Sequence, residues 1–554
     1  MTAANMEDVS RQIWEMKYRY KDENGAPIDL TVEDTWRRVA RGLSLHERDH
    51  QGWESRFYEC VRDFKFLPGG RIVANAGTRR KRVTMFNCYV LNRIEDSMEG
   101  IFATVRHAAL TQKQGGGIGM DFSTLRPMNS YIRGVHAVAS GPISFMRVFD
   151  ATCRTILSAG ERRGAQMGVL ACDHPDIEAF ITAKRDGQSL QMFNLSVAVS
   201  DAFIQAVKDD TLWDLTFEGR VYKTVRARDL WDKIMRSTYE HAEPGVILID
   251  RVNHENNLYY CEDIRATNPC GEQPLPPFGA CLLGSVNLTR FVRRPFEPDA
   301  DIDLDGISAV VTTAVRMLDN TIDLSNYPLE QQREEALRKR RMGIGVTGLA
   351  DMLVFLGLRY GSPEAARVAE GVMRTVCHTA YRASIELAKE KGAFPALDRE
   401  KYVRSRFVAR LPEDIREGIR QHGIRNSHLI SIAPTGTISL FAGNISSGLE
   451  PIFALRYIRK VRTGFGDTMT EQEVCDYAYK RYRERHPDAT PETLPPYFVT
   501  TDQITPREHI EMQAALQPYV DSSISKTINI PTDFPFDEFR DVYMYAYEKG
   551  LKGC

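Results

Sequence analysis

The chain has 554 residues, of which 43% are hydrophobic and 26% are charged, and its formal net charge at pH 7 is −2. This composition is ordinary for a globular protein and provides enough chain for one large core or several domains. The lack of a basic excess argues against a nucleic-acid polymer as partner, although a small anionic ligand needs only a local site.

Residues 1–67 are predicted to form a mostly helical N-terminal segment. Residues 1–11 are polar and acidic and lack the apolar core of a secretory signal. The segment is too short to hold a separate nucleotide-binding regulatory domain besides its helices. Residues 68–554 contain no repeat, low-complexity tract or obvious linker, so we interpret them as one large domain.

The next stretch combines strand, helix and glycine signals. Residues 84–91 are rich in β-favouring residues and predict a buried strand, with Cys88 at its centre. A helix is predicted from a cap at Asp96 or Ser97 to about residue 113. The glycines that follow, including Gly116 and Gly117, form either a flexible turn or a place where backbone approaches a ligand closely.

The loop 158–166 is polar, flanked by glycines, and carries the adjacent pair Arg162 and Arg163. Guanidinium groups are suited to the recognition of phosphates and bases, so the pair could bind a nucleotide. The alternative interpretation is a solvated basic loop without a binding role.

The remaining chain alternates helical and strand patterns. The most apolar run, 348–358, contains Asp351 and is too short to span a bilayer, so we expect a cytoplasmic protein without a membrane partner. A buried strand is predicted at 245–250. Helices are predicted at 201–208, 227–242, 304–322, 363–391 and 536–549, with a short strand pair within 212–225.

The loop 268–281 concentrates reactive side chains between prolines and glycines, which exclude an ordinary helix or central strand. It carries Asn268, Cys270, Glu272 and Cys281. An isolated cysteine is usually a small buried hydrophobic residue. The clustering of these polar and thiol side chains on one loop favours a catalytic role instead.

A second informative segment is predicted as a strand at 429–433, a turn at Pro434–Thr437 and a helix that begins near Ile438. Exposed N–H groups and the helix dipole at such a turn can bind an anion, with threonine hydroxyls as further donors. The alternative is plain helix capping.

The number and spacing of the cysteines, and the residues near them, limit the reactions that their thiols can carry out. No histidine lies in the 268–281 loop, which argues against a Cys–His hydrolase. The ten cysteines are too sparse for a disulfide scaffold and form no CxxC pair, so no structural metal site is expected. We expect instead one reactive thiol and two that deliver electrons by forming a disulfide, with Cys88 as candidate partner for Cys281.

An ordered set of segments resembles the ribonucleotide reductases from about residue 60 to the end. The amino-acid sequences of these segments are most similar to those of the class II, adenosylcobalamin-dependent enzymes. The matching segments are 86–88, 114–127, 268–273, 281–288, 317–320, 341–348, 433–438, 450–453 and 525–529.

This resemblance implies an α/β fold, a ten-stranded α/β barrel with the Cys270 loop as a central finger. Cys270 would become a thiyl radical and abstract the 3′-hydrogen of a ribonucleotide. Glu272 would act as base on the 3′-hydroxyl and Asn268 would hold the ribose. Cys88 and Cys281 would supply two electrons as the 2′-hydroxyl leaves as water.

The resemblance also implies binding sites for substrate and effector. The expected substrate-binding residues are Asn87, Gly116, Gly117, Ala433, Pro434, Thr435, Gly436, Thr437 and Ile438. A deoxynucleoside triphosphate effector would bind at a homodimer interface near Asp96, Arg126, Arg162 and Arg163, and would select among substrates by linkage.

Adenosylcobalamin is expected as cofactor from subfamily resemblance alone. Class II members usually continue past Cys554 into a tail with a redox cysteine pair, so the chain is expected to be truncated. An external dithiol, a thioredoxin-like protein or a separate redox chain would then reduce the disulfide, and dithiothreitol should support turnover better than thioredoxin. Diphosphates are the favoured substrates, with triphosphates as the alternative.

Three other functions stay open at this level. A class I large subunit would take its radical from a metal-containing partner. A glycyl-radical enzyme would need a glycine loop near the C-terminus, whereas residues 462–466 lie too far upstream. A nucleotide-binding sensor without chemistry conflicts with the intact Cys88, Cys270 and Cys281.

Overall fold

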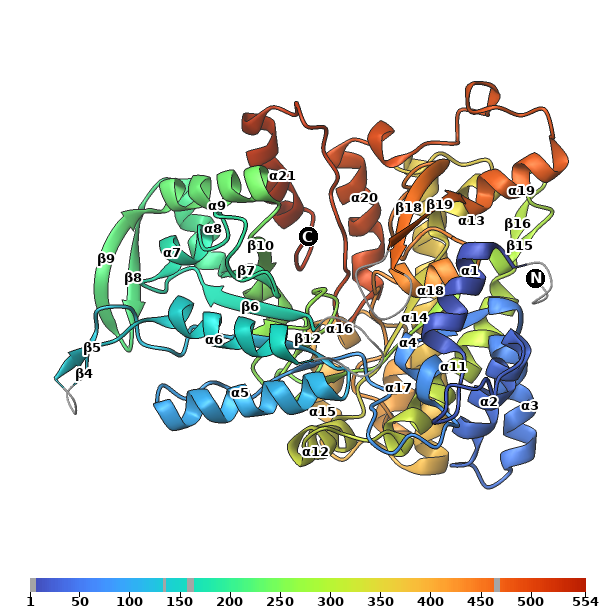
Figure 1. Cartoon of the computed structure of the whole chain (residues 1–554), viewed down its shortest axis with the longest axis horizontal. Coiled ribbons are helices and arrows are strands. Elements are labelled where there is room, and N and C mark those ends of the chain that lie inside the picture. Colours follow the sequence, from blue (N-terminus) through green and yellow to red (C-terminus); the bar gives the residue numbers. More distant parts are fainter. Residues whose placement is uncertain (1–5, 133–135, 157–163, 463–468) are drawn as a thin grey trace.

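The computed structural model describes residues 6–132, 136–156, 164–462 and 469–554. Helices dominate the N-terminal part of the chain and pack against the right-hand half of the molecule in Figure 1. A capping box at Thr31 starts the second of these helices, because the Thr31 hydroxyl and the Asp34 carboxylate each accept a backbone N–H. The helical elements are α1 (Asp8–Ile13), η2 (Trp14–Tyr18), α2 (Val32–Ser44), α3 (His50–Val61), η3 (Arg62–Phe64) and α4 (Gly70–Asn75).

A six-stranded sheet occupies the other half of the molecule, with the order β10-β7-β6-β3-β2-β13. Its neighbours are parallel except for β13, which runs antiparallel to β2. The strands are β2 (Cys88–Val90), β3 (Gly117–Asp121), β6 (Gln166–Ala171), β7 (Phe193–Val199), β10 (Gly245–Leu248) and β13 (Ala280–Cys281). Helices α5 (Met98–Lys113), α6 (Pro142–Thr155), α7 (Ile177–Ile181), α8 (Asp201–Asp209) and α9 (Ala227–His241) belong to this half (Figure 1).

A smaller, three-stranded sheet has the order β1-β14-β17. Strand β14 (Leu283–Asn287) is antiparallel to β1 (Phe66–Pro68) and parallel to β17 (Gly343–Thr347). Single parallel bridges, Ile344 to Ile430 and Ile432 to Ile524, extend this side further. Long helices α11 (Leu304–Leu324) and α14 (Pro363–Lys391) pack against each other in this half.

The remaining elements complete both halves. They are α10 (Ile249–His254), α12 (Glu330–Lys339), α13 (Leu349–Phe355), α15 (Arg399–Arg404), α16 (Arg406–Ala409), α17 (Glu413–His422), α18 (Gly436–Phe441), α19 (Tyr477–Arg485), α20 (Pro506–Leu516) and α21 (Phe536–Glu548), with short η4–η7 turns. Four pairs of strands, each strand two to seven residues long, lie outside the two main sheets. They are β4 (Tyr131–Ile132) with β5 (Ala137–Val138), β8 (Leu212–Phe217) with β9 (Arg220–Arg226), β15 (Val292–Arg293) with β16 (Asp301–Ile302), and β18 (Arg456–Arg462) with β19 (Met469–Cys475). Among the described residues, no helix combines the length and apolar character needed to cross a membrane.

A short hairpin fills the space between the two sheets. Its strands β11 (Ala266–Thr267) and β12 (Pro274–Leu275) are antiparallel, and β12 lies near the centre of the molecule (Figure 1). Ala266 and Leu275 join a buried apolar cluster drawn from both sheets. The six residues between the strands, 268–273, therefore form the tip of a finger anchored in the core.

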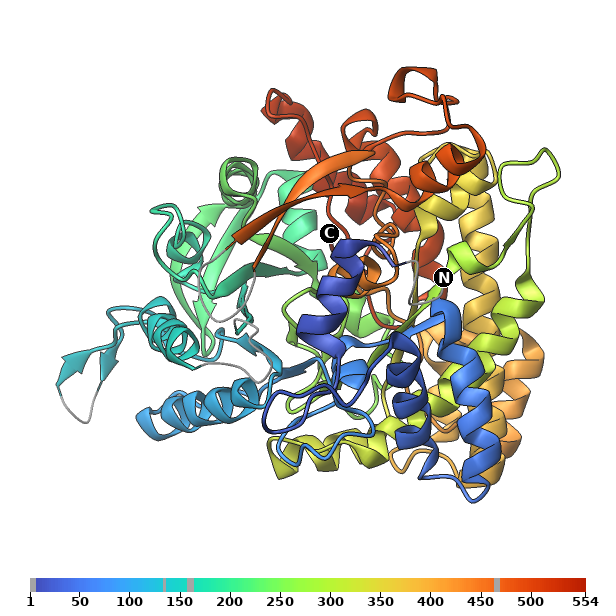
Figure 2. The same ribbon diagram turned by 45° about the vertical axis from the view of Figure 1, so that its right-hand side comes forward.

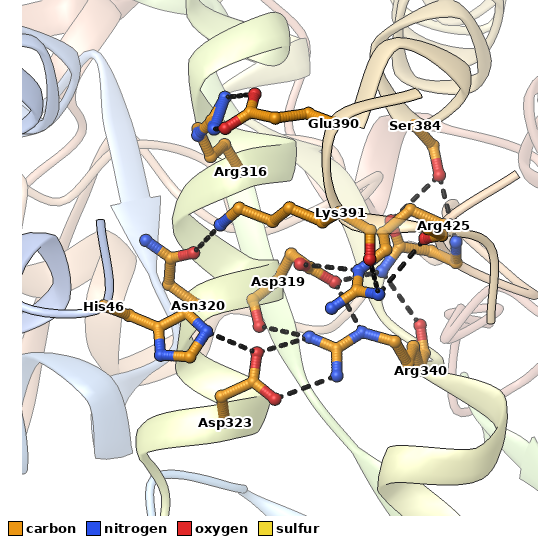
Figure 3. Close-up of polar contacts among 12 residues, drawn as sticks. His46, Arg316, Asp319, Asn320, Asp323, Arg340, Ser384, Glu390, Lys391 and Arg425 are labelled. Carbon is orange, nitrogen blue, oxygen red and sulfur yellow. Dashed lines mark hydrogen bonds and ion pairs between the residues drawn. The ribbon is translucent and has the colours of Figure 1, made fainter. Parts of the chain in front are cut away.

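Behind the smaller sheet, a buried ionic network joins α11 to neighbouring segments (Figure 3). The Asp319 carboxylate accepts hydrogen bonds from Arg340 Nε at 2.9 Å, Arg425 Nε at 3.1 Å and Asn426 Nδ2 at 2.9 Å. Asp323 continues the network to Arg340 and to His46 of the N-terminal segment. The network ties the helical N-terminal segment to the main domain.

Most predicted helices are confirmed, including 363–391 with the same ends and the Ser97 cap before α5. Three predicted strands, 84–91, 245–250 and 429–433, were too long, and the second ends at Leu248 because α10 begins at Ile249. In residues 84–87 the amides of Met85 and Phe86 bond to hydroxyls of Ser325 and Thr84, so the strand starts only at Cys88.

The predicted strand 429–433 is reduced to isolated bridges. The amides of Leu429 and Ile430 donate to the Asp521 carboxylate at 2.8 and 2.9 Å, which removes them from a regular ladder. A buried carboxylate thus competes with strand pairing at this position.

Candidate functional site

One cavity of about 190 Å³ brings together predicted residues that are far apart in the chain. It is lined by the finger residues Cys270 and Glu272, by Cys88 and its neighbour Asn87, and by the whole segment 433–438. Asn268 and Cys281 are fully buried and are not among the lining residues, but Asn268 belongs to the same finger tip and Cys281 pairs with Cys88. The fold therefore brings three of the predicted catalytic residues, Cys88, Cys270 and Glu272, to one cavity.

The finger tip is closed on itself and fixed to both halves of the molecule. Asn268 N donates to Gln273 O at 3.1 Å, and Gln273 N donates to Asn268 Oδ1 at 2.9 Å. Asn194 Nδ2 on β7 donates to Pro269 O at 2.9 Å, while Ser431 Oγ on the opposite side donates to Glu272 O at 2.8 Å. Cys270 is held between these anchors.

Two glycines on the facing strands make room for the finger. A Cβ atom on Gly119 of β3 would lie 1.8 Å from Thr267 O, and one on Gly343 of β17 would lie 2.5 Å from Gln273 Nε2. Any side chain at Gly119 would therefore displace the finger backbone. These contacts give a physical reason for one glycine in each of the runs 115–119 and 343–348.

Glu272 is the only carboxylate among the residues that line the cavity, within the described part of the chain. Its side chain is 2% exposed, and burial raises its pKa from 4.5 to about 7, which the Asn268 amide opposes only in part. Glu272 Oε2 and Asn268 Nδ2 are buried atoms that form no hydrogen bond of regular geometry with a described residue, although the Asn268 amide lies close enough to the carboxyl to lower its pKa. Such unpaired polar atoms are uncommon in a stable core and mark a place where a ligand can bind.

The two cysteines expected to exchange electrons lie opposite each other. Cys88 on β2 and Cys281 on β13 are register partners in adjacent antiparallel strands. Cα atoms of directly opposed residues are about 4.5–5.5 Å apart, within the range that a disulfide requires. Burial, together with the nearby Glu272 and two thiols, raises the pKa of Cys281 well above its ordinary value, so this cysteine carries its proton at neutral pH.

The segment 433–438 forms one wall of the cavity. Thr435 adopts a left-handed conformation, with φ +52°, and its hydroxyl accepts a hydrogen bond from Gly448 N at 2.8 Å. The first intrahelical bond of α18 runs from Ser439 N to Thr435 O at 2.9 Å, so the amides of residues 436–438 precede it. A Cβ on Gly436 would meet no atom within 4 Å, which leaves open space beside these amides.

The other predicted residues are placed differently. A Cβ on Gly117 would lie 3.2 Å from Cys88 Sγ and 3.1 Å from Pro269 Cγ, so this glycine abuts both reactive segments. Gly116 instead packs under the Tyr89 ring, and neither glycine is among the residues that line the cavity.

The predicted effector residues lie apart from the cavity. Arg126 Nε and Asp96 Oδ2 form an ion pair at 2.6 Å, and the Arg126 guanidinium also donates to Asp96 O at 3.1 Å. Arg162 and Arg163 lie outside the described residues.

Sequence reasoning missed one whole side of the cavity. The N-terminal segment and the turn after it contribute Lys17, Tyr18, Gly70, Arg71 and Arg80 to the lining. The available signal was the run of four cations at 79–82 directly after the turn at 66–71. Nothing in the sequence placed this run beside Cys270.

Comparisons with known proteins agree with this geometry. Family models described as the ribonucleotide reductase all-alpha domain and barrel domain match residues 6–81 and 86–554. A vitamin B12-dependent ribonucleoside-diphosphate reductase of Mycobacterium tuberculosis is 37% identical over 97% of this chain and 77% of its own length. That of Thermoplasma acidophilum is 38% identical over 98% of this chain and 69% of its own length.

More distant similarity extends to a ribonucleoside-diphosphate reductase subunit alpha of Chlamydia muridarum, at 26% identity over 99% of this chain and 59% of that protein. The matched barrel and all-alpha domains confirm the predicted α/β barrel with a helical N-terminal segment. With models that cover nearly the whole sequence and relatives above 30% identity, the chain belongs to the ribonucleotide reductase family.

Proposed function

We propose that the chain is an adenosylcobalamin-dependent reductase that converts ribonucleoside diphosphates to 2′-deoxyribonucleoside diphosphates for DNA precursor synthesis in the cytoplasm. One observation carries the chemistry: an exposed thiol, a buried carboxyl and two opposed cysteines meet at a single cavity. The names of the relatives at 37–38% identity support vitamin B12 dependence and diphosphate substrates.

The proposed reaction uses the residues of the cavity in fixed roles. Cys270, as a thiyl radical, takes the 3′-hydrogen of the ribose and later returns it. Glu272 accepts the 3′-hydroxyl proton, which suits a carboxyl with a pKa of about 7. Asn268, whose Nδ2 has no partner among the described residues, donates a hydrogen bond to the ribose.

The two opposed cysteines balance the reaction. Cys88 and Cys281 give up two electrons and two protons and form one S–S bond. The 2′-carbon loses its hydroxyl as water and gains one hydrogen. An external dithiol then reduces the disulfide and restores both thiols. Because the pKa of Cys281 is raised, its restored thiol stays protonated.

The position of Cys270 fits a radical cofactor that binds outside the cavity. Cys270 is exposed at the finger tip, whereas Glu272 and Cys281 behind it are buried. The one contribution expected of bound adenosylcobalamin is a radical equivalent at the Cys270 sulfur. The surrounding protein then excludes water from the carboxyl and from the buried thiol.

Substrate phosphates are proposed to bind the amides of residues 436–438 and the hydroxyl of Thr437, with Ala433 and Pro434 shaping the wall. Asn87, a lining residue beside Cys88, and Gly117, which abuts Cys88, are proposed to lie against the nucleotide. The Asp96–Arg126 pair is proposed as part of a deoxynucleoside triphosphate site.

A homodimer is proposed through α5. Met98 and Phe102 on this helix are 56% and 48% exposed, which is unusual for large apolar side chains on one helix. Helix α5 and the β4–β5 hairpin project from the body on the same side in Figure 1 and Figure 2. A second copy would cover this face and place Asp96 at the interface.

The decisive experiment measures deoxynucleotide formation from the four ribonucleoside diphosphates and triphosphates. The assay contains adenosylcobalamin and either dithiothreitol or a thioredoxin system, across an effector panel. We expect diphosphate turnover without a second subunit, and complete loss of turnover in Cys270→Ala with retained effector binding. Absence of product with adenosylcobalamin would reject the proposal in favour of a class I large subunit.

A further inference from the structure

The cavity has a charge distribution that the proposed roles do not use. Within the described part of the chain, its charged lining residues are three cations, Lys17, Arg71 and Arg80, and one carboxyl group, Glu272. Because Glu272 has a pKa of about 7, much of its negative charge is absent near neutral pH. The cavity of a chain with net charge −2 is thus locally cationic.

All three cations come from the N-terminal part of the chain, not from the barrel strands. Lys17 lies in the single-turn π-helix η2, a type of turn that is frequent at functional sites. Arg71 follows the first residue of α4, and a Cβ on Gly115 would lie 2.5 Å from its guanidinium carbon. A side chain at position 115 would therefore force this guanidinium to move.

Arg80 belongs to the basic loop, which we define as Arg79, Arg80, Lys81 and Arg82. All four residues are exposed, and in the described part of the chain none of them forms an ion pair with a carboxylate. Of these four residues only Arg80 lines the cavity, and its three basic neighbours add to the positive potential around it, which attracts anions.

The basic loop is held in place at both ends. Arg79 N donates to the Tyr20 hydroxyl at 3.1 Å, and Asn75 Nδ2 donates to Thr84 O at 3.1 Å. Asn75 itself lines the cavity. The backbone that carries Arg80 is therefore fixed beside the cavity at both ends of the loop.

We propose that the basic loop, through Arg80 and together with Lys17 and Arg71, binds the polyphosphate group of the nucleotide substrate in the same cavity as the 433–438 wall. This inference rests on the proposed function for the identity of the substrate. The N-terminal segment packs against α18, since Tyr18 contacts Phe441 with ring centroids 5.0 Å apart, so its cations and the amides of 436–438 can bind the same phosphates. The helical N-terminal segment thus acts as a substrate-binding element as well as a structural one.

The test measures nucleotide affinity by calorimetry on the intact chain without cofactor, so that no turnover occurs. The probes are a ribonucleoside diphosphate, the same ribonucleoside without phosphates, and inorganic pyrophosphate. Arg80→Gln should weaken diphosphate and pyrophosphate binding by about fivefold, as an exposed charge pair does, and leave ribonucleoside binding unchanged. Arg80→Lys keeps the charge and should restore most of the affinity.

Arg71→Lys should weaken diphosphate binding more, by about tenfold, because the half-buried guanidinium is lost together with its paired hydrogen bonds to phosphate. Arg404→Gln is the matched control, since Arg404 is an exposed arginine on α15 outside the cavity lining, and it should change nothing. Raising the salt concentration should weaken diphosphate binding less in Arg80→Gln than in the unaltered chain.

Diphosphate affinity that is unchanged in both Arg80→Gln and Arg71→Lys would overturn the inference, as would an equal loss for the unphosphorylated ribonucleoside. In turnover assays, Arg80→Gln should raise KM for the diphosphate and leave kcat unchanged. If no turnover occurs with adenosylcobalamin while the charge-dependent binding persists, the proposed function fails and the polyphosphate site stands.

Discussion

Two buried carboxylates show how one molecule uses the same group for opposite purposes. Asp319 in the network of Figure 3 is 0% exposed, and Glu272 at the finger is 2% exposed. Burial raises the pKa of both, but Arg340 and Arg425 more than reverse this at Asp319, so its pKa is lowered. No cation does so at Glu272, whose pKa rises to about 7.

The difference separates a structural site from a reactive one. Asp319 satisfies its oxygens within the protein, so it has nothing left to offer a ligand. Glu272 Oε2 and Asn268 Nδ2 are left unpaired within the described chain, at a cost in folding free energy. In the proposed function, a substrate that binds there supplies the missing hydrogen-bond partners, so that the cost of leaving them unpaired is recovered on binding.

The largest expected effect is on catalysis at Glu272. Glu272→Gln removes the base and should lower kcat by about 10²- to 10⁴-fold. Diphosphate affinity and the protein's fold should remain, because the substitution keeps the shape of the side chain. Activity within a factor of ten of the unaltered chain would remove Glu272 from its proposed role.

The equivalent change in the network should act on stability. Asp319→Asn leaves Arg340 and Arg425 buried without their main counter-charge, and should lower the free energy of unfolding by about 3 to 5 kcal/mol. The measurement is urea denaturation at pH 7. The residual activity of the folded fraction serves as control, since Asp319 lies outside the cavity lining.

The two sites should also respond to pH with opposite signs. The folded-state pKa of Glu272 lies above its ordinary value of 4.5, so the folded state keeps a proton that the unfolded state loses between about pH 4.5 and 7. Stability therefore falls as the pH rises through this window. Glu272→Gln should relieve a penalty of up to about 3 kcal/mol at pH 8 and almost none at pH 4.

Asp319 behaves in the opposite way. Its lowered folded-state pKa means that its stabilisation is present above the ordinary value of 3.8 and is lost as the pH falls through the folded-state pKa. Asp319→Asn should therefore flatten the acid limb of the stability profile. An unchanged acid limb would show that Asp319 is not a stabilising ion partner.

The smallest expected effect is on stability, at a glycine in a helix that contributes to the ionic network. Gly371 lies within α14, the helix that also carries Lys391 of the network, and a Cβ there would meet no atom within 4 Å. Gly371→Ala should raise the free energy of unfolding by about 0.5 to 1 kcal/mol, through helix propensity. A loss of stability in thermal denaturation would mean that hidden contacts exist at this position.

Local patterns predicted the helices well, because their ends carry caps and their apolar faces have a clear period. Helix 363–391 and the cap at Ser97 are examples. Segment 429–433 was predicted as a strand because its apolar pattern is the same whether its amides meet a neighbouring strand or, as here, Asp521. That choice depends on a residue distant in sequence.

The sequence by itself determined which side chains we propose for the chemistry, because Asn268, Cys270 and Glu272 share one short loop and stand in a family pattern. Only the tertiary structure decided what surrounds them. It set Cys88 opposite Cys281, left Glu272 without a cation, and brought Lys17, Arg71 and Arg80 to the same cavity. The reason is physical: pKa values, strand register and cavity charge depend on neighbours in space, and those neighbours come from far along the chain.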